Sequence, residues 1–250
     1  MILRRVHPGP AEDVDLDDRD RLLALYAPPR ADWLRLNLVT SVSGSAAGWD
    51  GTSETLTSAS DRRILGVIRE LSDVVLVGAQ SVRAEGYLRP RRAPLAVVTG
   101  SGDLEGHRIT GDGPAIVVVC PPEAVTRVEQ TLPHADILTV PGPRIAAADI
   151  LSALHGHGFR SVVCEGGPAL ARQFVVAGLV DEICLTTSPR LTGVTLPLLG
   201  LAEFPEVALE LIASQQVTMA TLPPHMVKNA SGLVNLARNV GGAFGLAILN

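Results

Sequence analysis

The segment VVCEGGPAL, residues 162–170, places a carboxylate and two glycines where an apolar run changes into a helical pattern. A proline in the first turn of a helix is compatible with free N–H groups there, and the positive end of the helix dipole attracts anions. The glycines at 166 and 167 let a phosphate approach the backbone without a Cβ in the way. The spacing alone leaves two interpretations open: a phosphate site at Gly166-Gly167, or an ordinary tight turn between a strand and a helix.

Two more polar loops follow apolar runs, at the edge of the sheet where open α/β folds bind ligands. Ser81 comes shortly after VVLVG and either contacts a phosphate or ribose or caps a helix; the residues alone favour the cap. Gly100-Ser101-Gly102 follows LAVVT, but the next glycine is Gly106, so the G-x-G-x-x-G fingerprint of dinucleotide sites is not met. This second loop either holds a cofactor phosphate or simply turns the chain.

Several catalytic signatures are missing from the sequence: the P-loop, the G-x-S-x-G nucleophile elbow and the zinc-deaminase pattern. His155 and His157 stand two residues apart with no third ligand nearby, so we expect no metal site. In the helical pattern DRRILGVIREL, Arg69 lies near the following strand and is the residue expected to contact an anion. The remaining charged residues of that helix are expected to face solvent: Asp61, Arg62, Arg63 and Glu70.

Short β-branched runs alternate with helical patterns from Trp33 onward, which is typical of an α/β fold. The runs predict strands at 35–41, 74–78, 95–99, 115–120, 162–167 and 182–188, and the helical patterns predict helices at about 61–71, 145–157 and 168–178. The first of these helices is preceded by a start signal at Ser58–Asp61. Because the runs are apolar throughout, we expect a largely parallel sheet with helices on both faces.

The chain has 250 residues, enough to bury a full core, and its net charge of −5 argues against a nucleic-acid partner. Cys120, Cys164 and Cys184 lie in apolar runs and are expected to be buried, reduced thiols. No signal-peptide pattern opens the chain, so we expect a cytoplasmic protein. Residues 1–30 form a leader, in which Leu22–Tyr26 predict one short helix packed on the core.

Taken together, these motifs resemble the riboflavin-pathway pyrimidine reductase family, the reductase domain of the bifunctional deaminase-reductase. Three segments carry the resemblance: WLRLNLVTSVSGSA (33–46), TLTSASDRRILGVIRELSDVVLVGAQSVRAEGY (55–87) and VVCEGGPALARQFVVAGLVDEICLTTSPRLTG (162–193). The resemblance covers about 31–217 and is similar to stand-alone actinobacterial members without a deaminase domain. It implies a reductase domain at 31–220 that forms a homodimer. It also implies a dihydrofolate reductase-like fold, with a mixed, mostly parallel central sheet.

Position by position, the resemblance implies contacts with NADPH along Val39, Thr55, Ser81, Glu85, Gly100, Ser101, Gly166, Gly167, Pro168, Ala169 and Leu170. It implies substrate contacts at Ser53, Arg69, Arg92 and Glu165, and it identifies no catalytic residue. In this family the cofactor's hydride reduces the ribosylamino group of a phosphorylated aminouracil to a ribitylamino group. Arginines suit the phosphate, and Glu165 suits the amino and N–H groups of the pyrimidine. Arg83, two residues after Ser81, is a candidate for the 2′-phosphate of NADPH.

Two features depart from the family pattern. Ser43 stands where the family's S-L-D-G loop has an aspartate. The tail at 221–250 resembles a fragment of a multidrug-efflux transporter of the major facilitator superfamily, in place of the family's final strand, which predicts an exposed sheet edge. After Arg238 the tail has only about a dozen apolar residues where a spanning helix needs ~20, so we expect an irregular amphipathic helix and no stable membrane insertion.

The leading hypothesis is therefore an NADPH-dependent reductase that acts on a small molecule. The substrate is 5-amino-6-(5-phosphoribosylamino)uracil of riboflavin synthesis or a related pteridine-like compound, with dihydrofolate-type reduction as the second choice. The alternative is a non-catalytic nucleotide-binding or interaction module that retains the fold. A membrane-anchored protein is a third hypothesis and depends on the tail alone.

Overall fold

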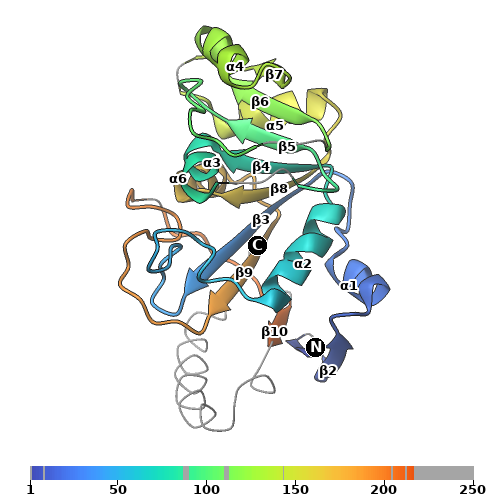
Figure 1. Ribbon diagram of the computed structural model, residues 1–250. Helices are drawn as coiled ribbons and strands as arrows, with labels where there is room; N and C mark the ends of the chain where they lie inside the picture. Colours follow the sequence, from blue (N-terminus) through green and yellow to red (C-terminus); the bar gives the residue numbers. More distant parts are fainter. Residues whose placement is uncertain are drawn as a thin grey trace.

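The computed structural model describes residues 2–7, 9–86, 90–109, 113–142, 144–203, 205–211 and 213–216. Its main feature is a seven-stranded sheet in the order β7-β6-β5-β4-β8-β3-β9 (Figure 1). The strands are β3 (Trp33–Ser41), β4 (Val74–Gly78), β5 (Leu95–Val98), β6 (Ile116–Cys120), β7 (Asp136–Thr139), β8 (Ser161–Gly166) and β9 (Glu182–Ser188). Each described pairing within this sheet is parallel. The mostly parallel α/β architecture is confirmed; β7 is a strand that the sequence pattern did not predict.

Helices cover both faces of this sheet, as predicted. One face packs against α2 (Ala59–Glu70), α3 (Ala79–Glu85) and α4 (Val125–Thr131), which follows a short 3-10 turn at Pro122–Ala124. The other face packs against α5 (Ala147–Gly156) and α6 (Pro168–Val176). Strand β4 contributes to both cores, because Val74 and Leu76 face the second group of helices while Val75 and Val77 face the first.

The starts of two helices test the expectations about capping. Ser58 caps α2 as predicted, since its hydroxyl accepts a hydrogen bond from the Asp61 backbone N–H at 3.1 Å. Ser81, by contrast, lies inside α3, whose N-cap is Gly78 without a side-chain hydrogen bond. The interpretation of Ser81 as a helix cap is therefore wrong. Its side chain does not cap the helix and instead lines the cleft described below.

The leader adds a small antiparallel sheet in the order β10-β1-β2. Its strands are β1 (Ile2–His7), β2 (Glu12–Asp15) and β10 (Ser214–Gln216), and β2 leads into α1 (Arg19–Tyr26). Leu3, Val14, Leu16 and Leu22 form a small core that packs on Val67 of α2. The predicted helix is confirmed. The strands were not predicted, because β10 (SQQ) has no apolar residue, β2 (EDVD) has one, and the three of β1 (ILRRVH) do not alternate with polar residues.

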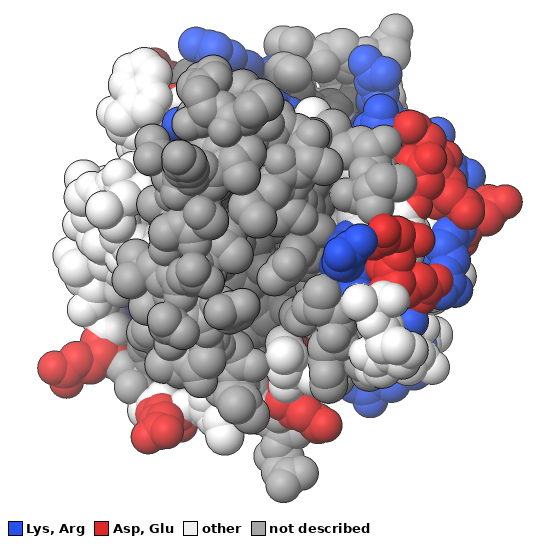
Figure 2. Space-filling view, turned by 90° about the horizontal axis from the view of Figure 1, so that it is seen from below, with Lys and Arg blue, Asp and Glu red and all other residues white. Residues whose placement is uncertain are grey.

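Ion pairs cover the outer side of the leader. They join Arg4 to Asp13, Arg5 and Arg21 to Glu12, Arg19 to Glu70, and Arg63 to Asp17. Figure 2 shows positive and negative side chains intermingled on the right of this face. Solvent screens such exposed pairs, so they contribute little to stability.

The far edge of the large sheet is open among the described residues. Strand β9 pairs with β3 on one side, and no described strand pairs with its other side. The transporter-like tail and the amphipathic helix expected for it lie outside the described residues, which end at 216. Within the part of the chain that is described, no helix is long and apolar enough to cross a membrane.

Candidate active site

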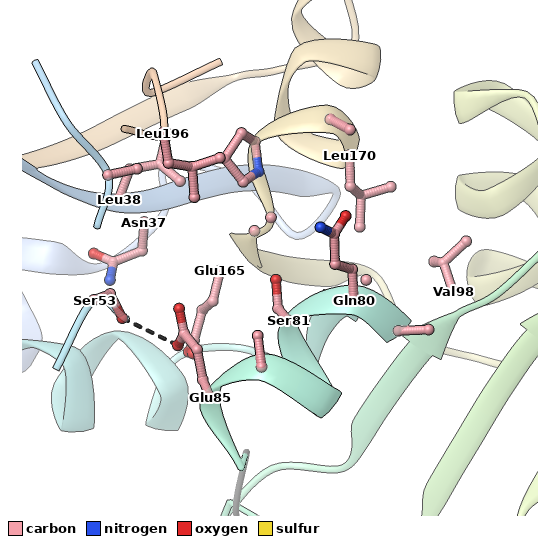
Figure 3. Close-up of a pocket in the computed structure, with 18 of the residues that line it drawn as sticks. Asn37, Leu38, Ser53, Gln80, Ser81, Glu85, Val98, Glu165, Leu170 and Leu196 are labelled. Atoms are coloured by element: carbon pink, nitrogen blue, oxygen red, sulfur yellow. Dashed lines mark hydrogen bonds between the residues drawn. The ribbon is translucent and has the colours of Figure 1, made fainter. Parts of the chain in front are cut away.

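A cleft of about 1800 Å³ opens along the carboxyl edge of the large sheet, where the ends of β4, β5 and β8 meet. Helices α2 and α3 line one side and α6 lines the other. Small-molecule pockets usually have volumes of about 300–1,000 Å³, so this cleft has room for a cofactor and a substrate together. Figure 3 shows side chains from these elements converging on the cleft.

The turn from β8 into α6 forms one wall of the cleft and depends on its two glycines. Gly166 has φ of +112°, in the left-handed region that favours glycine. Gly167 is the N-cap of α6, Pro168 has no N–H, and the Leu170 N–H donates to the Gly167 carbonyl at 3.0 Å. Among the described residues, the Ala169 N–H is thus the donor of the first turn that remains available to a ligand. A Cβ on Gly167 would lie only 2.9 Å from the hydroxyl of Ser81. The two glycines thus let this turn approach α3 closely.

A partly buried ion pair lines the floor of the cleft beside this turn. Arg69 of α2 donates to both carboxylate oxygens of Glu165, at 2.6 Å from Nε to Oε1 and 2.6 Å from Nη2 to Oε2. The Glu165 side chain is only 7% exposed. Burial alone would lower the pKa of Arg69, but the hydrogen bonds and charge of Glu165 outweigh it and raise that pKa. The pair is therefore a charged, rigid fork that fixes the Glu165 carboxylate in the cleft.

Glu85 at the end of α3 presents a second carboxylate to the cleft. Its Oε2 accepts a hydrogen bond from the Ser53 hydroxyl at 3.0 Å, drawn as the dashed line in Figure 3. Desolvation by neighbouring atoms raises the pKa of Glu85 although the side chain remains open to solvent, and the charges of Glu165 and Glu54 raise it further. Ser53 and Glu85 thus connect the loop before α2 to α3 across the cleft.

Asp61 is a cleft residue that the sequence analysis assigned to the solvated face of its helix, and that assignment is wrong. The carboxyl lines the cleft, is partly buried, and accepts a hydrogen bond from the Thr186 hydroxyl of β9 at 2.6 Å. Burial raises the pKa of Asp61, against the opposing effects of Thr186 and the Arg62 charge. A signal was present in the sequence: Asp61, Leu65 and Arg69 recur every fourth residue and share one helix face.

Most residues that the resemblance assigned to ligands line this one cleft: Val39, Ser53, Arg69, Ser81, Glu85, Gly100, Ser101, Glu165, Gly166, Gly167, Pro168, Ala169 and Leu170. Thr55 and Arg92 do not. Thr55 donates to Asp50 at 3.0 Å and lines a smaller pocket nearby, and Arg92 pairs with Glu70 at 2.5 Å. Arg91, its neighbour in the chain, lines the cleft instead.

Ser43, which replaces the family's aspartate, does not line the cleft. Its hydroxyl donates to the Thr192 carbonyl at 2.6 Å and lies 2.9 Å from the Ser41 hydroxyl, and the Thr192 N–H donates back to Ser43 at 3.2 Å. Ser43 therefore joins the loop after β3 to the loop after β9. An aspartate would lack the hydroxyl hydrogen that the Thr192 carbonyl accepts here.

The cysteines and histidines add no reactive group to the site. Cys120 and Cys164 are buried as predicted, whereas Cys184 is only partly buried. Burial raises the pKa of Cys164 and of Cys184 to about 12, so these thiols are poor nucleophiles at neutral pH. Among the residues that the structure describes, no group of three or more His, Cys, Asp or Glu side chains could hold a metal ion.

Comparison with known proteins identifies relatives of this chain. The chain is 27% identical over 169 residues to the 2,5-diamino-6-ribosylamino-4(3H)-pyrimidinone 5′-phosphate reductase of Methanothermobacter thermautotrophicus, a match that covers 63% of this chain and 78% of that protein. It is 30% identical over 175 residues to the riboflavin biosynthesis protein RibD of Mycobacterium tuberculosis, over 66% of this chain. The chain spans only 43% of the length of that second relative.

Two further matches concern the fold and the tail. A pyrimidine reductase-like protein from Corynebacterium diphtheriae has a similar fold, with a TM-score of 0.61 and 20% identity over 76% of this chain and 91% of that one. This likeness confirms the predicted reductase fold. A short match of 40 residues, 52% identical, joins 16% of this chain to 8% of the colistin resistance protein EmrB of Acinetobacter baumannii. It gives limited support to the transporter resemblance.

The family-level comparison is the broadest of these matches. The chain matches the RibD C-terminal domain over residues 32–222, which include the large sheet and the cleft residues described above. The motifs that suggested the resemblance lie within this range. The chain belongs to the RibD C-terminal domain family.

Proposed function

We propose that this chain is an NADPH-dependent reductase of riboflavin synthesis that acts on a phosphorylated ribosylaminopyrimidine. The proposal rests on one observation: the glycine turn into α6 and the Arg69–Glu165 ion pair line the same cleft. The printed name of the Methanothermobacter relative, a ribosylaminopyrimidinone 5′-phosphate reductase, supports this substrate class. The substrate is 5-amino-6-(5-phosphoribosylamino)uracil or a related pteridine-like compound, and the place of action is the cytoplasm.

The cleft fits a nicotinamide dinucleotide in size and in chemistry. The first turn of α6 offers the Ala169 N–H and the positive end of the helix dipole to a pyrophosphate, and the Ser81 hydroxyl lies against the same turn. Gly100 and Ser101 line the cleft after β5 and offer contacts to a ribose or phosphate. The bound cofactor supplies a hydride; the protein binds, orients and encloses the reacting groups.

The pyrimidine and the phosphate of the substrate are expected to contact different side chains. Two lone pairs of the Glu165 carboxylate remain after Arg69 has donated to both oxygens, and they suit the amino and N–H groups of a pyrimidine. Arg91 and Arg172 line the cleft and have no ion pair or hydrogen bond among the described residues, so they suit the substrate phosphate. Arg91 replaces Arg92 in this role, because Arg92 is paired with Glu70.

The preference for NADPH over NADH is assigned to Arg83. This residue lies in the last turn of α3, lines the cleft, and donates to the Asp103 carbonyl in the loop that contains Ser101. A guanidinium at this position suits the 2′-phosphate. We expect Arg83→Ala to weaken NADPH binding about 10-fold and to leave NADH binding unchanged, because only NADPH carries that phosphate. Equal losses for both cofactors would contradict the assignment.

A homodimer is proposed because of the open edge of β9. Leu185 on this strand is 48% exposed, and an unpaired strand edge is a surface that a second copy can cover. Light scattering on the full chain is expected to give the mass of a dimer. Leu185→Lys is expected to give a monomer that still melts cooperatively; a wild-type monomer would contradict the proposal.

The function is tested by thermal melting of the full chain with NADPH, followed by an assay of cofactor oxidation with the ribosylaminopyrimidine phosphate. A ligand that binds only the folded state raises the melting temperature. We expect the melting temperature to rise with NADPH and the enzyme to turn over. For Glu165→Gln we expect kcat/KM to fall about 100-fold, because one of the two carboxylate oxygens that accept hydrogen bonds is replaced by an NH2 group that donates. Asp17→Asn, which removes an exposed carboxylate, is the control. Nucleotide binding without turnover would favour the non-catalytic module, and no binding would contradict both.

A further inference from the structure

The cleft contains one carboxyl group for which the proposed function has no role. Asp61 lies in the first turn of α2, and its Oδ1 accepts the Thr186 hydroxyl at 2.6 Å. Thr186 is the register partner of Val39, the residue of β3 that is expected to contact the cofactor. This pairing places the Asp61 carboxyl beside β3 and β9, next to a residue that is expected to contact the cofactor.

The other carboxylates of the cleft are engaged differently. Glu165 is held by both donors of Arg69, Glu54 is paired with Arg62, and Glu85 is open to solvent and accepts from Ser53. Asp61 has a neutral hydroxyl as its partner, and its second oxygen has no hydrogen-bond partner among the described residues. This oxygen is therefore available to a ligand in the cleft.

The charges around Asp61 leave its protonated form accessible. On its own helix the nearby charge is Arg62, which is already paired with Glu54 of the preceding loop. Thr186 of β9 and Asn37 of β3 are uncharged, and Glu165 of β8 is paired with Arg69. Burial is the largest influence on Asp61 and raises its pKa, and a bound substrate that excludes water would raise it further.

We propose that Asp61 is the acid that protonates the ring oxygen of the substrate's ribose during reduction. The inference rests on the proposed function. Reduction adds a hydride from the nicotinamide to C1′ and breaks the C1′–O4′ bond, whose electron pair stays on O4′. O4′ then takes one proton from the Asp61 carboxyl, and the carboxylate is reprotonated from solvent. The step yields the open-chain ribitylamino product.

Thr186 is the positioning residue in this arrangement. Its hydroxyl donates to Oδ1, so it fixes the direction of the carboxyl and favours the ionised form. Removing it in Thr186→Val therefore raises the pKa of Asp61. Because a proton donor acts only while it is protonated, activity falls as pH rises through that pKa, and Thr186→Val shifts this fall to higher pH. A merely structural role for Thr186 would leave the pH profile in place.

The first test is a carbon-13 NMR titration of aspartate carboxyl groups in the full chain without ligands. The Asp61 signal is identified by its loss in Asp61→Asn. We expect a pKa above the ordinary aspartate value, raised further in Thr186→Val. A pKa at or below the ordinary value would overturn the proposal without any assay of activity.

The second test compares the pH dependence of kcat in the wild type and two variants. Asp61→Asn keeps an oxygen for Thr186 and is expected to lose about 100-fold or more of the activity, together with the alkaline fall, while its NADPH-dependent melting shift is unchanged. Loss of the alkaline fall in Glu85→Gln instead would overturn the proposal, as would Asp61→Asn with wild-type rates. An inactive wild type would overturn the proposed function and, with it, this role; an active wild type with active Asp61→Asn would overturn only the role.

Discussion

Two parts of the large sheet differ in what their strands bury. The apolar part, β5 and β6 at residues 95–98 and 116–120, buries valine, leucine, isoleucine, alanine and cysteine and carries no charged side chain. The polar part, β3 and β9 at 33–41 and 182–188, contains Arg35, Glu182 and Thr186. Each of these three has a polar partner. The difference shows that the most polar side chains of this sheet, Arg35, Glu182 and Thr186, are accommodated by polar partners on the face that packs against α2.

The largest expected effect is in the apolar part. Val118 is fully buried in β6, and Val118→Asp places a carboxyl where no donor is present among its core neighbours. We expect the free energy of unfolding to fall by more than about 4 kcal/mol, measured by urea denaturation. Thr139→Asp, on the exposed side of neighbouring β7, is the control and is expected to change it by less than about 0.5 kcal/mol. If Val118→Asp unfolds with nearly the wild-type free energy, β6 tolerates an unpaired carboxyl and the contrast between the apolar and polar parts is wrong.

The ion pair of the polar part gives the next largest effect. The Arg35 side chain is 4% exposed and that of Glu182 is 14% exposed, and Trp33 also donates to Glu182 at 2.9 Å. Arg35→Met leaves Glu182 buried without its cation, and we expect a loss of about 3–5 kcal/mol in unfolding free energy. Arg35→Met with Glu182→Leu is expected to recover much of this loss. Neither residue lines the cleft, so cofactor binding by the folded fraction should persist; its loss would contradict this separation.

A smaller effect is expected where the sheet meets the cleft. Gly167→Ala brings a Cβ within 2.9 Å of the Ser81 hydroxyl, so the turn into α6 must shift. We expect NADPH to bind about 10-fold more weakly, measured by calorimetry, because the Ala169 N–H and the start of α6 move away from the bound cofactor. Adding Ser81→Gly removes the clashing hydroxyl. If the double variant binds no better than Gly167→Ala, the loss arises elsewhere than in this contact.

The smallest effect concerns Asp61 and pH. Burial makes the pKa of Asp61 higher in the folded chain than in the unfolded chain. Its contribution to stability is therefore fully present below the unfolded-state pKa and is lost as pH rises through the folded-state pKa. Asp61→Asn has no carboxyl to ionise, so in urea denaturation the variant should gain stability relative to the wild type as pH rises from below the ordinary aspartate pKa toward neutral. Asp17→Asn is the control; an equal gain there would show that the effect is not specific to Asp61.

Much of the fold followed from the sequence because burial on both faces leaves a simple pattern. Apolar runs such as IVVVC indicate strands without any knowledge of their partners, and the Ser58 cap marks the start of α2. Strand β7 was missed because DILT is short and two of its four residues are exposed. Strands β1 and β10 were missed because their pairing joins distant parts of the chain, which no local pattern records.

The site could be predicted where the backbone itself is special, and less well where side chains decide. Gly166 and Gly167 identify the turn into α6 from the sequence alone. Arg91 and Arg92, by contrast, are adjacent residues of the same type, and only the structure shows that Arg91 lines the cleft while Arg92 pairs with Glu70. Asp61 was missed because its partner Thr186 is 125 residues further along the chain. A charged residue in the first turn of a helix is common, so its type gave no hint of burial.

The pairing of β1 with β10 sets an order for the chain during synthesis. Arg4 and Gln216 are register partners, although roughly 200 residues separate them in the chain. At translation rates of about 5–20 residues per second, β1 waits for roughly 10–40 seconds before its partner strand leaves the ribosome. Over that interval β2 is the one partner strand that the described residues offer to β1, and a lone two-stranded hairpin is marginally stable in water. The residues of β1, made well before β10, thus reach their final hydrogen bonds late.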